Sequence, residues 1–501
     1  MDEMLAGLDV GTTGCKVTVY TTGGRHLGRC FADYPASRTA AAHEIDAEAI
    51  WQAVQQVLTE AGARWPGIGG LGVTSFGESF VLLDDAGAPL LPMMLYTDPR
   101  GQGECDALCQ AVGPDELARI TGVKPHAMYS APKLMWVKAH RPDVYAEATH
   151  ICPIIDYIVY RLTGVHRIDH SLASRTMLFD IRRLEWSRPL LDAAGIDGRL
   201  LPEPVPTGTA VGPIGPDVAS DLGWRPSVPV VLGGQDQVAA AVGCGVFDDG
   251  DAGDGAGTVE CITPVFSAIP DGPALTDGGY AIVPYVEGKY VCYAFSFTGG
   301  AAVDWFIETL PDAARAAAFD KLGSDVPLLE PTCLLVLPHF AGAATPRMDY
   351  GSKAAIVGLT LATTRRDVFA GIMEGVCFEM RLNLERLADA GLPIASLRAS
   401  GGGANSRLWM QARADILGVP VTAMRSAEAG GLGAAMLAGV ATGAFPDLRT
   451  AAAALVVERE TFSPRPAVQR RYDDLYARYA KLYDAVRPLV CEIGDTACSP
   501  H

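Results

Sequence analysis

Residues 5–20 read LAGLDVGTTGCKVTVY, a stretch in which an acidic side chain ends an apolar run. After Asp9 and Val10 come Gly-Thr-Thr-Gly at 11–14, and Lys16 lies two residues further on. The flanking segments 3–10 and 16–22 are rich in β-branched and apolar residues, which predicts two strands joined by a turn. Charge and small residues therefore stand where a strand leaves the core.

Two kinds of chemistry explain this pattern. A carboxylate at a strand end, such as Asp9, can hold a metal ion through water. The backbone N–H groups that follow, with the hydroxyls of Thr12 and Thr13, can hold phosphate oxygens, while Gly11 and Gly14 permit a tight turn. The alternative is a plain hairpin turn that the Asp and Thr side chains cap. The motif is not a P-loop, because GxxxxGK[ST] is absent here.

A second glycine-rich segment indicates that the chain has two related lobes. Its 501 residues exceed one typical core. Residues 249–265, DGDAGDGAGTVECITPV, predict a glycine-rich turn that leads into an apolar strand. Within it, residues 254–258 echo residues 9–13. We place the lobe boundary near 247–253 and predict domains at 1–247 and 248–501.

The order of predicted elements indicates an α/β fold. A third strand is expected over 26–34, a helix over 46–63 with Asp46 as its N-cap, and another strand over 68–76. This β-β-β-α-β beginning predicts a mixed sheet with helices on its faces. Residues 105–195 read as helix-rich, and the last eleven residues, 491–501, read as a frayed tail.

A third glycine-rich junction lies near the end of the chain. Residues 398–409, RASGGGANSRLW, place Gly401, Gly402 and Gly403 between an apolar strand and a helix that opens near Asn405. Such a junction lets a nucleotide lie on bare backbone at a helix N-terminus. The alternative is an ordinary strand-to-helix loop, against which three consecutive glycines weigh because they cost entropy on folding.

Two further carboxylates follow predicted strands. Asp236, in VVLGGQDQ, is well placed to accept a proton from a substrate hydroxyl, but an N-capping role explains its position equally simply. Glu78 could accept hydrogen bonds from sugar hydroxyls, and in isolation it reads as a solvated loop charge. Asp98 and Arg100 could pair with each other or line a polar pocket.

Composition excludes several classes of partner. The net charge is −18 with no basic stripe, which argues against nucleic acid and against anionic membranes. The N-terminus lacks the features of a signal peptide, and no apolar stretch is long enough to span a bilayer. Twelve cysteines without a CxxC pair predict reduced, packed thiols and a cytoplasmic location.

Taken together, the motifs resemble those of the FGGY family of carbohydrate kinases over essentially the whole chain. Residues 7–16, GLDVGTTGCK, resemble the first phosphate turn of that family, and residues 128–136, MYSAPKLMW, fit its first signature. Residues 356–375 resemble the second signature, from which they depart at Gly371. The resemblance implies a two-lobed actin/hexokinase-like (ribonuclease H-like) fold, with ATP and a sugar meeting in the cleft between mixed sheets.

The resemblance also implies roles for individual residues. Asp236 matches the catalytic base, and Asp9 would help to position Mg²⁺. Glu78 and Gln237 match sugar-contacting positions. Phosphate and nucleotide contacts are implied for the following residues: Gly11, Thr12, Thr13, Lys16, Gly257, Thr258, Gly401, Gly402, Gly403 and Asn405.

The sugar is less clearly indicated. Xylulokinases tend to carry Met-His where this chain has Gly77-Glu78, whereas Glu78 and Gln237 look like glycerol kinase residues. The small residue at position 77 could leave room for a longer or branched substrate, unless Phe76 or Phe80 fills it. A ketopentose such as xylulose or ribulose is expected first; another polyol, a tetrose, a deoxy sugar or an aldonate is the alternative.

Two other classes compete with a sugar kinase. Chaperone and filament ATPases share the fold, but no substrate-binding β-domain follows here. A catalytically inactive sugar sensor would show a missing Asp236 or a disrupted glycine loop, and both are intact. The sequence leaves the oligomeric state open, with a homodimer as one option.

Overall fold

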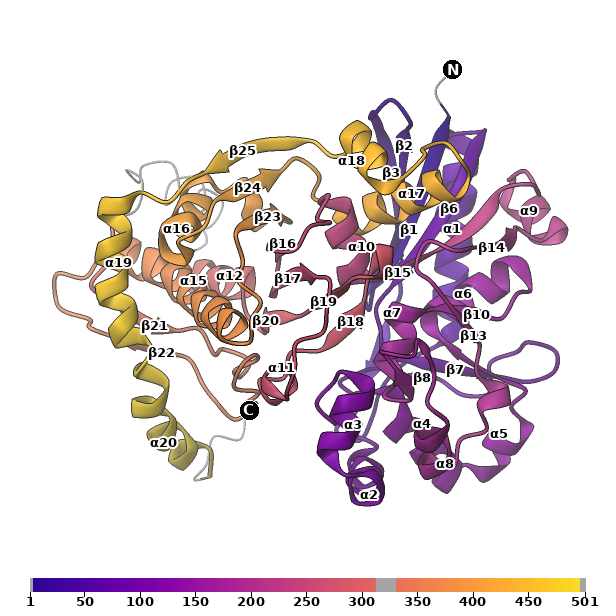
Figure 1. Ribbon diagram of the computed structural model, residues 1–501, viewed down its shortest axis with the longest axis horizontal. Coiled ribbons are helices and arrows are strands. Elements are labelled where there is room, and N and C mark those ends of the chain that lie inside the picture. Colours follow the sequence, from indigo (N-terminus) through magenta and orange to yellow (C-terminus); the bar gives the residue numbers. More distant parts are fainter. Residues whose placement is uncertain (1–2, 312–329, 496–501) are drawn as a thin grey trace.

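The computed structural model describes residues 3–311 and 330–495, which form two lobes, each built on a mixed β-sheet covered by helices (Figure 1). The predicted two-lobed α/β architecture is therefore confirmed. Within these residues, no helix combines the length and the apolar character needed to cross a bilayer.

The first sheet is built around the quoted hairpin. Its strand order is β14-β15-β6-β1-β2-β3, with β1 antiparallel to β2 and parallel to β6. The strands are β1 (Met4–Val10), β2 (Gly14–Thr21), β3 (His26–Asp33), β6 (Ile68–Ser75), β14 (Ala210–Pro213) and β15 (Pro229–Gln235).

The second sheet repeats this arrangement. β16 (Asp251–Ala256) is antiparallel to β17 (Glu260–Phe266) and parallel to β23 (Ser396–Ser400), as β1 is to β2 and β6. Beyond β23 lie β24 (Val421–Met424), parallel to it, and β25 (Glu458–Phe462), which is antiparallel to β24. The same strand order in both sheets supports the predicted relationship between the lobes.

The glycine-rich segment of the second lobe differs from its prediction. Residues 251–256 form the strand β16, and the turn is confined to the residues between β16 and β17. Gly257 thus stands where Gly11 stands in the first lobe, directly after the first strand. The aspartates are not equivalent, since Asp254 lies inside β16 and is buried against Arg413.

The remaining strands are short. They are β4 (Ala36–Arg38), β5 (His43–Ile45), β7 (Phe80–Leu83), β8 (Met93–Met94), β9 (His150–Pro153), β10 (Arg167–Asp169), β11 (Phe179–Asp180), β12 (Glu185–Trp186), β13 (Glu203–Val205), β18 (Ile282–Pro284), β19 (Tyr290–Cys292), β20 (Ala294–Ser296), β21 (Leu335–Leu337) and β22 (Ala355–Val357).

Helices cover both sheets. Those of the first half are α1 (Ala47–Arg64), α2 (Gln102–Val112), α3 (Pro114–Thr121), α4 (Ser130–His140), α5 (Pro142–Glu147), α6 (Ile154–Thr163), α7 (His170–Ala173), α8 (Arg188–Ala194), α9 (Pro216–Leu222) and α10 (Asp236–Gly243). Those of the second half are α11 (Ala274–Asp277), α12 (Gly300–Glu308), α15 (Arg365–Asp389), α16 (Arg407–Leu417), α17 (Ala429–Ala441), α18 (Leu448–Leu455), α19 (Pro466–Tyr479) and α20 (Leu482–Asp495).

Local signals explain several helix ends. Asp46 accepts a hydrogen bond from the N–H of Glu48 and caps α1, as predicted. Ser406 caps α16 by accepting from the N–H of Trp409. The predicted tail over residues 491–501 begins too early, because α20 continues to Asp495. Residues 496–501 lie outside the described part of the chain.

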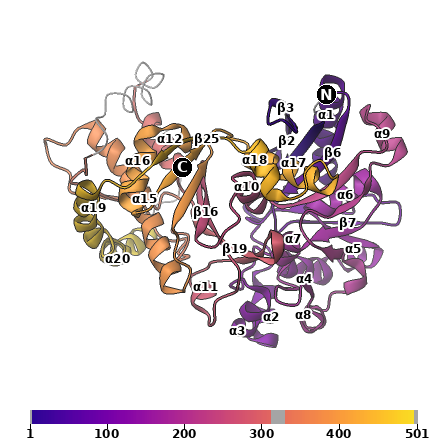
Figure 2. The same ribbon diagram turned by 45° about the horizontal axis from the view of Figure 1, so that its top comes forward.

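One helix from the second half packs on the first sheet. Both ribbon views place α17 beside β1 and β6 (Figures 1 and 2), and glycines permit this close approach. A Cβ added at Gly7 would lie 1.8 Å from the carbonyl oxygen of Gly431, and one at Gly72 would lie 2.0 Å from that of Ala434. The two halves of the chain are thereby held together on one face of the first sheet, over its central strands.

Candidate active site

A cavity of about 610 Å³ lies at the carboxyl ends of β1, β6 and β15, where the two lobes meet. It brings together predicted residues from three separate stretches of the sequence. They are Asp9, Gly11, Thr12, Thr13, Lys16, Glu78, Asp236 and Gln237. Val259, Cys261 and Tyr293 of the second half also line it, so both lobes contribute walls.

The other predicted residues do not line this cavity, but they lie next to one another. A Cβ at Gly401 would be 2.8 Å from the carbonyl oxygen of Ala256, and one at Gly403 would be 3.1 Å from the same atom. Gly401 has a φ of +92°, a conformation that suits glycine. The triple-glycine loop therefore rests on the end of β16, directly before Gly257 and Thr258.

The two glycine-containing segments of the second lobe, residues 257–258 and 401–405, both leave polar groups accessible to solvent. Thr258, Gly402 and Asn405 are exposed, and nothing lies within 4 Å of the position that a Cβ on Gly402 would take. The carbonyl oxygen of Gly257 accepts a hydrogen bond from the N–H of Gly300 at 2.8 Å, which ties the turn to the start of α12. These segments therefore have accessible backbone, and the hydrogen bond to Gly257 holds the turn in place.

The first glycine turn is braced by its own hairpin. The N–H of Gly11 donates to the carbonyl oxygen of Gly14 at 3.0 Å, and the hydroxyl of Tyr34 donates to the carbonyl oxygen of Gly11. Gly14 is required by close packing, because a Cβ there would lie 2.7 Å from the carbonyl oxygen of Ala32. The turn therefore has a defined shape before any ligand enters.

Asp9 lines the cavity and belongs to a cluster of charged side chains. Lys16 Nζ lies 3.3 Å from Asp9 Oδ2 and 2.6 Å from Glu428 Oε2, and Arg29 Nη1 lies 2.5 Å from Glu428 Oε1. Burial raises the pKa of Asp9, which Lys16 opposes. Burial alone would lower the pKa of Lys16, but the charges of Asp9 and Glu428 outweigh it and raise that pKa. Lys16 is thus held as a cation.

Asp236 is the first residue of α10, and it is not the cap of that helix. The cap is Gln235, whose side-chain oxygen accepts from the N–H of Gln237 at 2.9 Å. The alternative that Asp236 serves as N-cap is therefore wrong. Burial raises the pKa of Asp236 to about 7, with further contributions from the negative charges of Asp9 and Glu78.

Gln235 connects Asp236 to both lobes. Its side-chain amide nitrogen donates to Asp236 Oδ1, while its oxygen accepts from the hydroxyl of Tyr293 at 2.5 Å. Its backbone N–H donates to Ser171 Oγ at 2.8 Å, and Asp169 accepts from the N–H of Ser171 at 2.8 Å. This chain of hydrogen bonds orients the Asp236 carboxylate at the end of β15.

Glu78 is not a solvated loop charge, since it is buried and paired. Arg175 Nε lies 2.6 Å and Nη2 2.5 Å from Glu78 Oε1. The Arg175 guanidinium lies between two aromatic rings, with Cζ 5.2 Å from the centroid of Tyr129 and 5.5 Å from that of Tyr293. Glu78 also adopts a φ of +66°, a strained conformation for a residue with a side chain.

The space beside Gly77 is filled from another element. A Cβ at Gly77 would lie 3.2 Å from Cγ of Arg175, 3.3 Å from its Cβ and 3.6 Å from Leu172 Cδ2. The place that a side chain at position 77 would take is therefore occupied by Arg175, while Gly77 itself lines the cavity, and whether a longer substrate fits stays a prediction. Neither Phe76 nor Phe80 is the cause: the Arg175 stem occupies the space.

Sequence reasoning missed several residues of the cavity. Arg175 carried a signal, because it lies in SRTMLFD, a stretch that resembles the family. Gln235 directly precedes Asp236 and could have been considered with it. Tyr96 and Tyr293 carried no local signal, and only the tertiary structure brings them to the cavity. Asp98 and Arg100 pair with each other, with Arg100 Nε 2.8 Å from Asp98 Oδ1.

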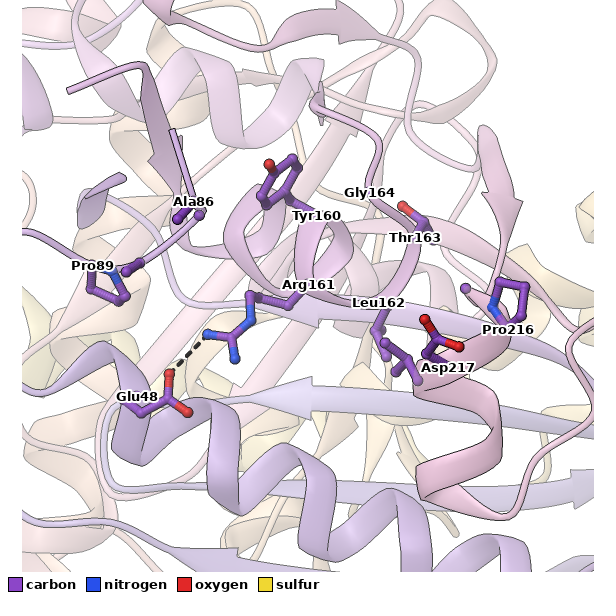
Figure 3. A pocket seen from close by; sticks show the side chains of 14 residues that line it. Glu48, Ala86, Pro89, Tyr160, Arg161, Leu162, Thr163, Gly164, Pro216 and Asp217 are labelled. Atoms are coloured by element: carbon purple, nitrogen blue, oxygen red, sulfur yellow. Dashed lines mark hydrogen bonds and ion pairs between the residues drawn. The ribbon is translucent and has the colours of Figure 1, made fainter. Parts of the chain in front are cut away.

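A second pocket, of about 570 Å³, lies on the surface of the first lobe (Figure 3). It contains none of the predicted site residues. Arg161 of α6 reaches across it to Glu48 of α1, with Nη1 2.9 Å from Oε2, and Asp217 lies at its other end. Its charged groups are largely paired with each other, so the interlobe cavity remains the candidate active site.

Comparison with known proteins identifies the family of the chain. The model of the FGGY family of carbohydrate kinases, N-terminal domain, matches residues 4–243, and the C-terminal domain model matches residues 274–442. A xylulose kinase of Bacillus subtilis is 26% identical, with 97% of this chain and 98% of that protein covered. A glycerol kinase of Symbiobacterium thermophilum is 31% identical, with 97% and 98% covered.

Solved structures share the whole architecture. A xylulose kinase from Rhodospirillum rubrum superposes with a TM-score of 0.87 at 27% identity, covering 97% of this chain and 100% of that chain. A gluconate kinase from Lactobacillus acidophilus gives a TM-score of 0.90 at 24% identity, covering 99% and 100%. The fold is thus the two-lobed actin/hexokinase-like fold. The chain belongs to the FGGY family of carbohydrate kinases, and it is an ATP-dependent carbohydrate kinase.

Proposed function

We propose that this kinase transfers the γ-phosphate of ATP to a primary hydroxyl of a small sugar, with Asp236 as the general base. The observation that carries this proposal is the state of Asp236. Asp236 lines the cavity, and its side chain is not used to cap α10, because Gln235 has that role. Burial raises its pKa to about 7. A carboxylate with a pKa near the working pH suits proton abstraction from an attacking hydroxyl.

The phosphates of ATP would lie between the two glycine turns. Gly11, Thr12 and Thr13 border the cavity on one side, and Gly257 and Thr258 follow the equivalent strand of the other lobe. Lys16, held as a cation, is placed to offset phosphate charge. The loop of Gly401, Gly402 and Gly403, in which Gly402 is exposed, would receive the adenosine together with the exposed Asn405.

The residues around Asp9 also suit a divalent cation. Burial, followed by the negative charges of Asp9 and Glu78, raises the pKa of Asp236, so three carboxylates lie close enough together to interact. Carboxylate oxygens are the ligands that Mg²⁺ prefers, usually together with substrate phosphates. We propose that Asp9 holds Mg²⁺, which neutralises charge on the transferring phosphate when bound.

The sugar would lie against Glu78, Gln237 and Asp236. Glu78 offers acceptors for hydroxyls, and Arg175 fixes its direction. Our first choice is a ketopentose such as xylulose or ribulose, supported by the xylulose kinases among the relatives. The glycerol kinases among them favour a shorter polyol or a tetrose as the second candidate.

A coupled ADP-release assay tests the proposal. The purified protein would be given Mg-ATP and a panel of ketopentoses, polyols, tetroses, deoxy sugars and aldonates. One strong, sugar-dependent signal identifies the acceptor. ATP binding without turnover of any sugar would favour a catalytically inactive sensor. Light scattering on the same preparation tests the homodimer.

A further inference from the structure

A cluster of three side chains that could bind a metal ion lies in the first lobe, apart from the residues that line the active-site cavity. Cys152 lies on β9, Asp156 in the first turn of α6, and His166 in the segment before β10. Their potential ligand atoms all lie within 4.8 Å of one another, and Asp156 Oδ2 is 3.0 Å from His166 Nε2.

The polar atoms of this cluster are poorly satisfied. Cys152 and Asp156 are fully buried, and the His166 side chain is 17% exposed. Both carboxylate oxygens of Asp156 and Nε2 of His166 are buried without a hydrogen bond of good geometry. Buried polar atoms left in this state are costly, and an absent ion is one recognised explanation.

The chemical types of these three side chains indicate which metal ion they would bind. A thiolate, an imidazole and a carboxylate together suit Zn²⁺, whereas Ca²⁺ and Mg²⁺ prefer oxygen ligands only. Ligand atoms around one zinc ion lie about 3–4 Å apart, so small side-chain rotations would close the site. Three protein ligands leave a fourth position for water.

The surroundings give the cluster a route to solvent. The ring of Tyr160 lies 5.2 Å from that of His150 and 6.2 Å from that of His166. Tyr160 also lines the surface pocket of Figure 3, one turn along α6 from Asp156. His166 therefore lies beside a surface depression, on the open side of an otherwise buried cluster.

We propose that Cys152, Asp156 and His166 bind one zinc ion that fastens β9, α6 and β10 together. Binding would release the thiol proton of Cys152 to solvent. The ion would act outside the phosphoryl transfer, since none of the three residues lines the active-site cavity. The inference goes beyond the proposed function and does not depend on the identity of the sugar.

The test uses the full chain, stripped with a chelator and titrated with Co²⁺ in place of zinc. We expect about one ion per chain and a thiolate-to-cobalt charge-transfer absorption in the near ultraviolet. Zinc measured by mass spectrometry after dialysis should reach the same stoichiometry, and it should raise the melting temperature.

Variants assign the ion to the cluster. Cys152→Ala and His166→Gln should abolish the charge-transfer band and the zinc-dependent rise in melting temperature. Cys292→Ala is the matched control, because Cys292 is equally buried but lies in the second lobe, and it should keep both. If a variant fails to fold, the cobalt spectrum of the unchanged protein still decides. No uptake by folded protein, or uptake without the thiolate band, would overturn the proposal and leave a buried Asp156–His166 pair.

Discussion

The guanidinium of Arg175 lies on the carboxylate of Glu78, with Nε 2.6 Å and Nη2 2.5 Å from the same oxygen, Oε1. Both side chains are less than a tenth exposed. The backbone of Glu78 is held as well, because Ser130 Oγ donates to its carbonyl oxygen at 2.8 Å. The direction of the Glu78 carboxylate is thus set by residues that are distant in the sequence.

Replacing Arg175 by Met should weaken sugar binding and destabilise the fold. Removing one partner of a buried ion pair costs about 3–5 kcal/mol, because the other charge is left without a partner. We expect KM for the sugar to rise at least about tenfold, a change of about 1.4 kcal/mol, with KM for ATP unchanged. Steady-state kinetics and a thermal melt measure both effects.

Two variants separate this role from a general loss of charge. Arg175→Lys should restore part of the sugar affinity, because it keeps the cation but not the two-point contact. Arg183→Ala is the control, since Arg183 is exposed and pairs only with exposed Glu185. An Arg175→Met enzyme that is stable and keeps its KM for the sugar would contradict the positioning role.

Asp236→Asn should remove the general base. General-base catalysis contributes about 10²–10⁴-fold, so kcat should fall by that factor while ATP affinity is retained. Asp221→Asn on the exposed face of α9 is the matched control and should be silent. Rapid ADP release by Asp236→Asn at a normal rate would show that another group takes the proton.

The pH dependence should report the same residue. Burial, followed by the charges of Asp9 and Glu78, raises the pKa of Asp236 to about 7, and only its deprotonated form can accept a proton. The value of kcat/KM should therefore rise about tenfold per pH unit below pH 7 and level off above it. Glu78→Gln removes one of the raising charges, so the bend in its profile should move to lower pH. A profile that is flat between pH 5 and 8 would refute the assignment.

Gly77→Ala should disturb the sugar site through Arg175. The new Cβ would lie 3.2 Å from Arg175 Cγ, so the arginine stem must move and Glu78 loses its alignment. We expect a higher KM for the sugar with little change in ATP affinity. Gly103→Ala is the control, because its Cβ meets nothing within 4 Å and alanine favours the α2 helix. An unchanged KM in Gly77→Ala would mean that Arg175 adapts freely.

Arg413→Met should destabilise the second lobe without touching the sugar site. Arg413 is fully buried, with Nη1 2.5 Å from Asp254 Oδ2 and Nη2 2.5 Å from Glu260 Oε2. Its loss leaves two buried carboxylates unpaired, at a cost of about 3–5 kcal/mol. Denaturant unfolding measures the change. Arg407→Met, which removes an exposed partner of Glu460, should have almost no effect.

The sequence by itself determined the parts that are contiguous along the chain. The hairpin around residues 9–16, the helix cap at Asp46 and the strand-to-helix junction at Asp236 are local, because turn chemistry and periodicity act over a few residues. Segment 251–256 was misassigned as a turn, since glycines that favour turns were placed in a strand by pairing with β17 and β23.

Only the tertiary structure decided the relationships between distant residues. Arg175 pairs with Glu78 across 97 positions, and it fills the space that Gly77 leaves open. Gln235 takes the capping role from Asp236 because Tyr293 and Ser171 fix its side chain and backbone. Such pairings depend on which surfaces pack together, and a local pattern does not encode that. The sequence therefore determined which groups could do the chemistry, while packing decided their partners, their burial and the pKa of Asp236.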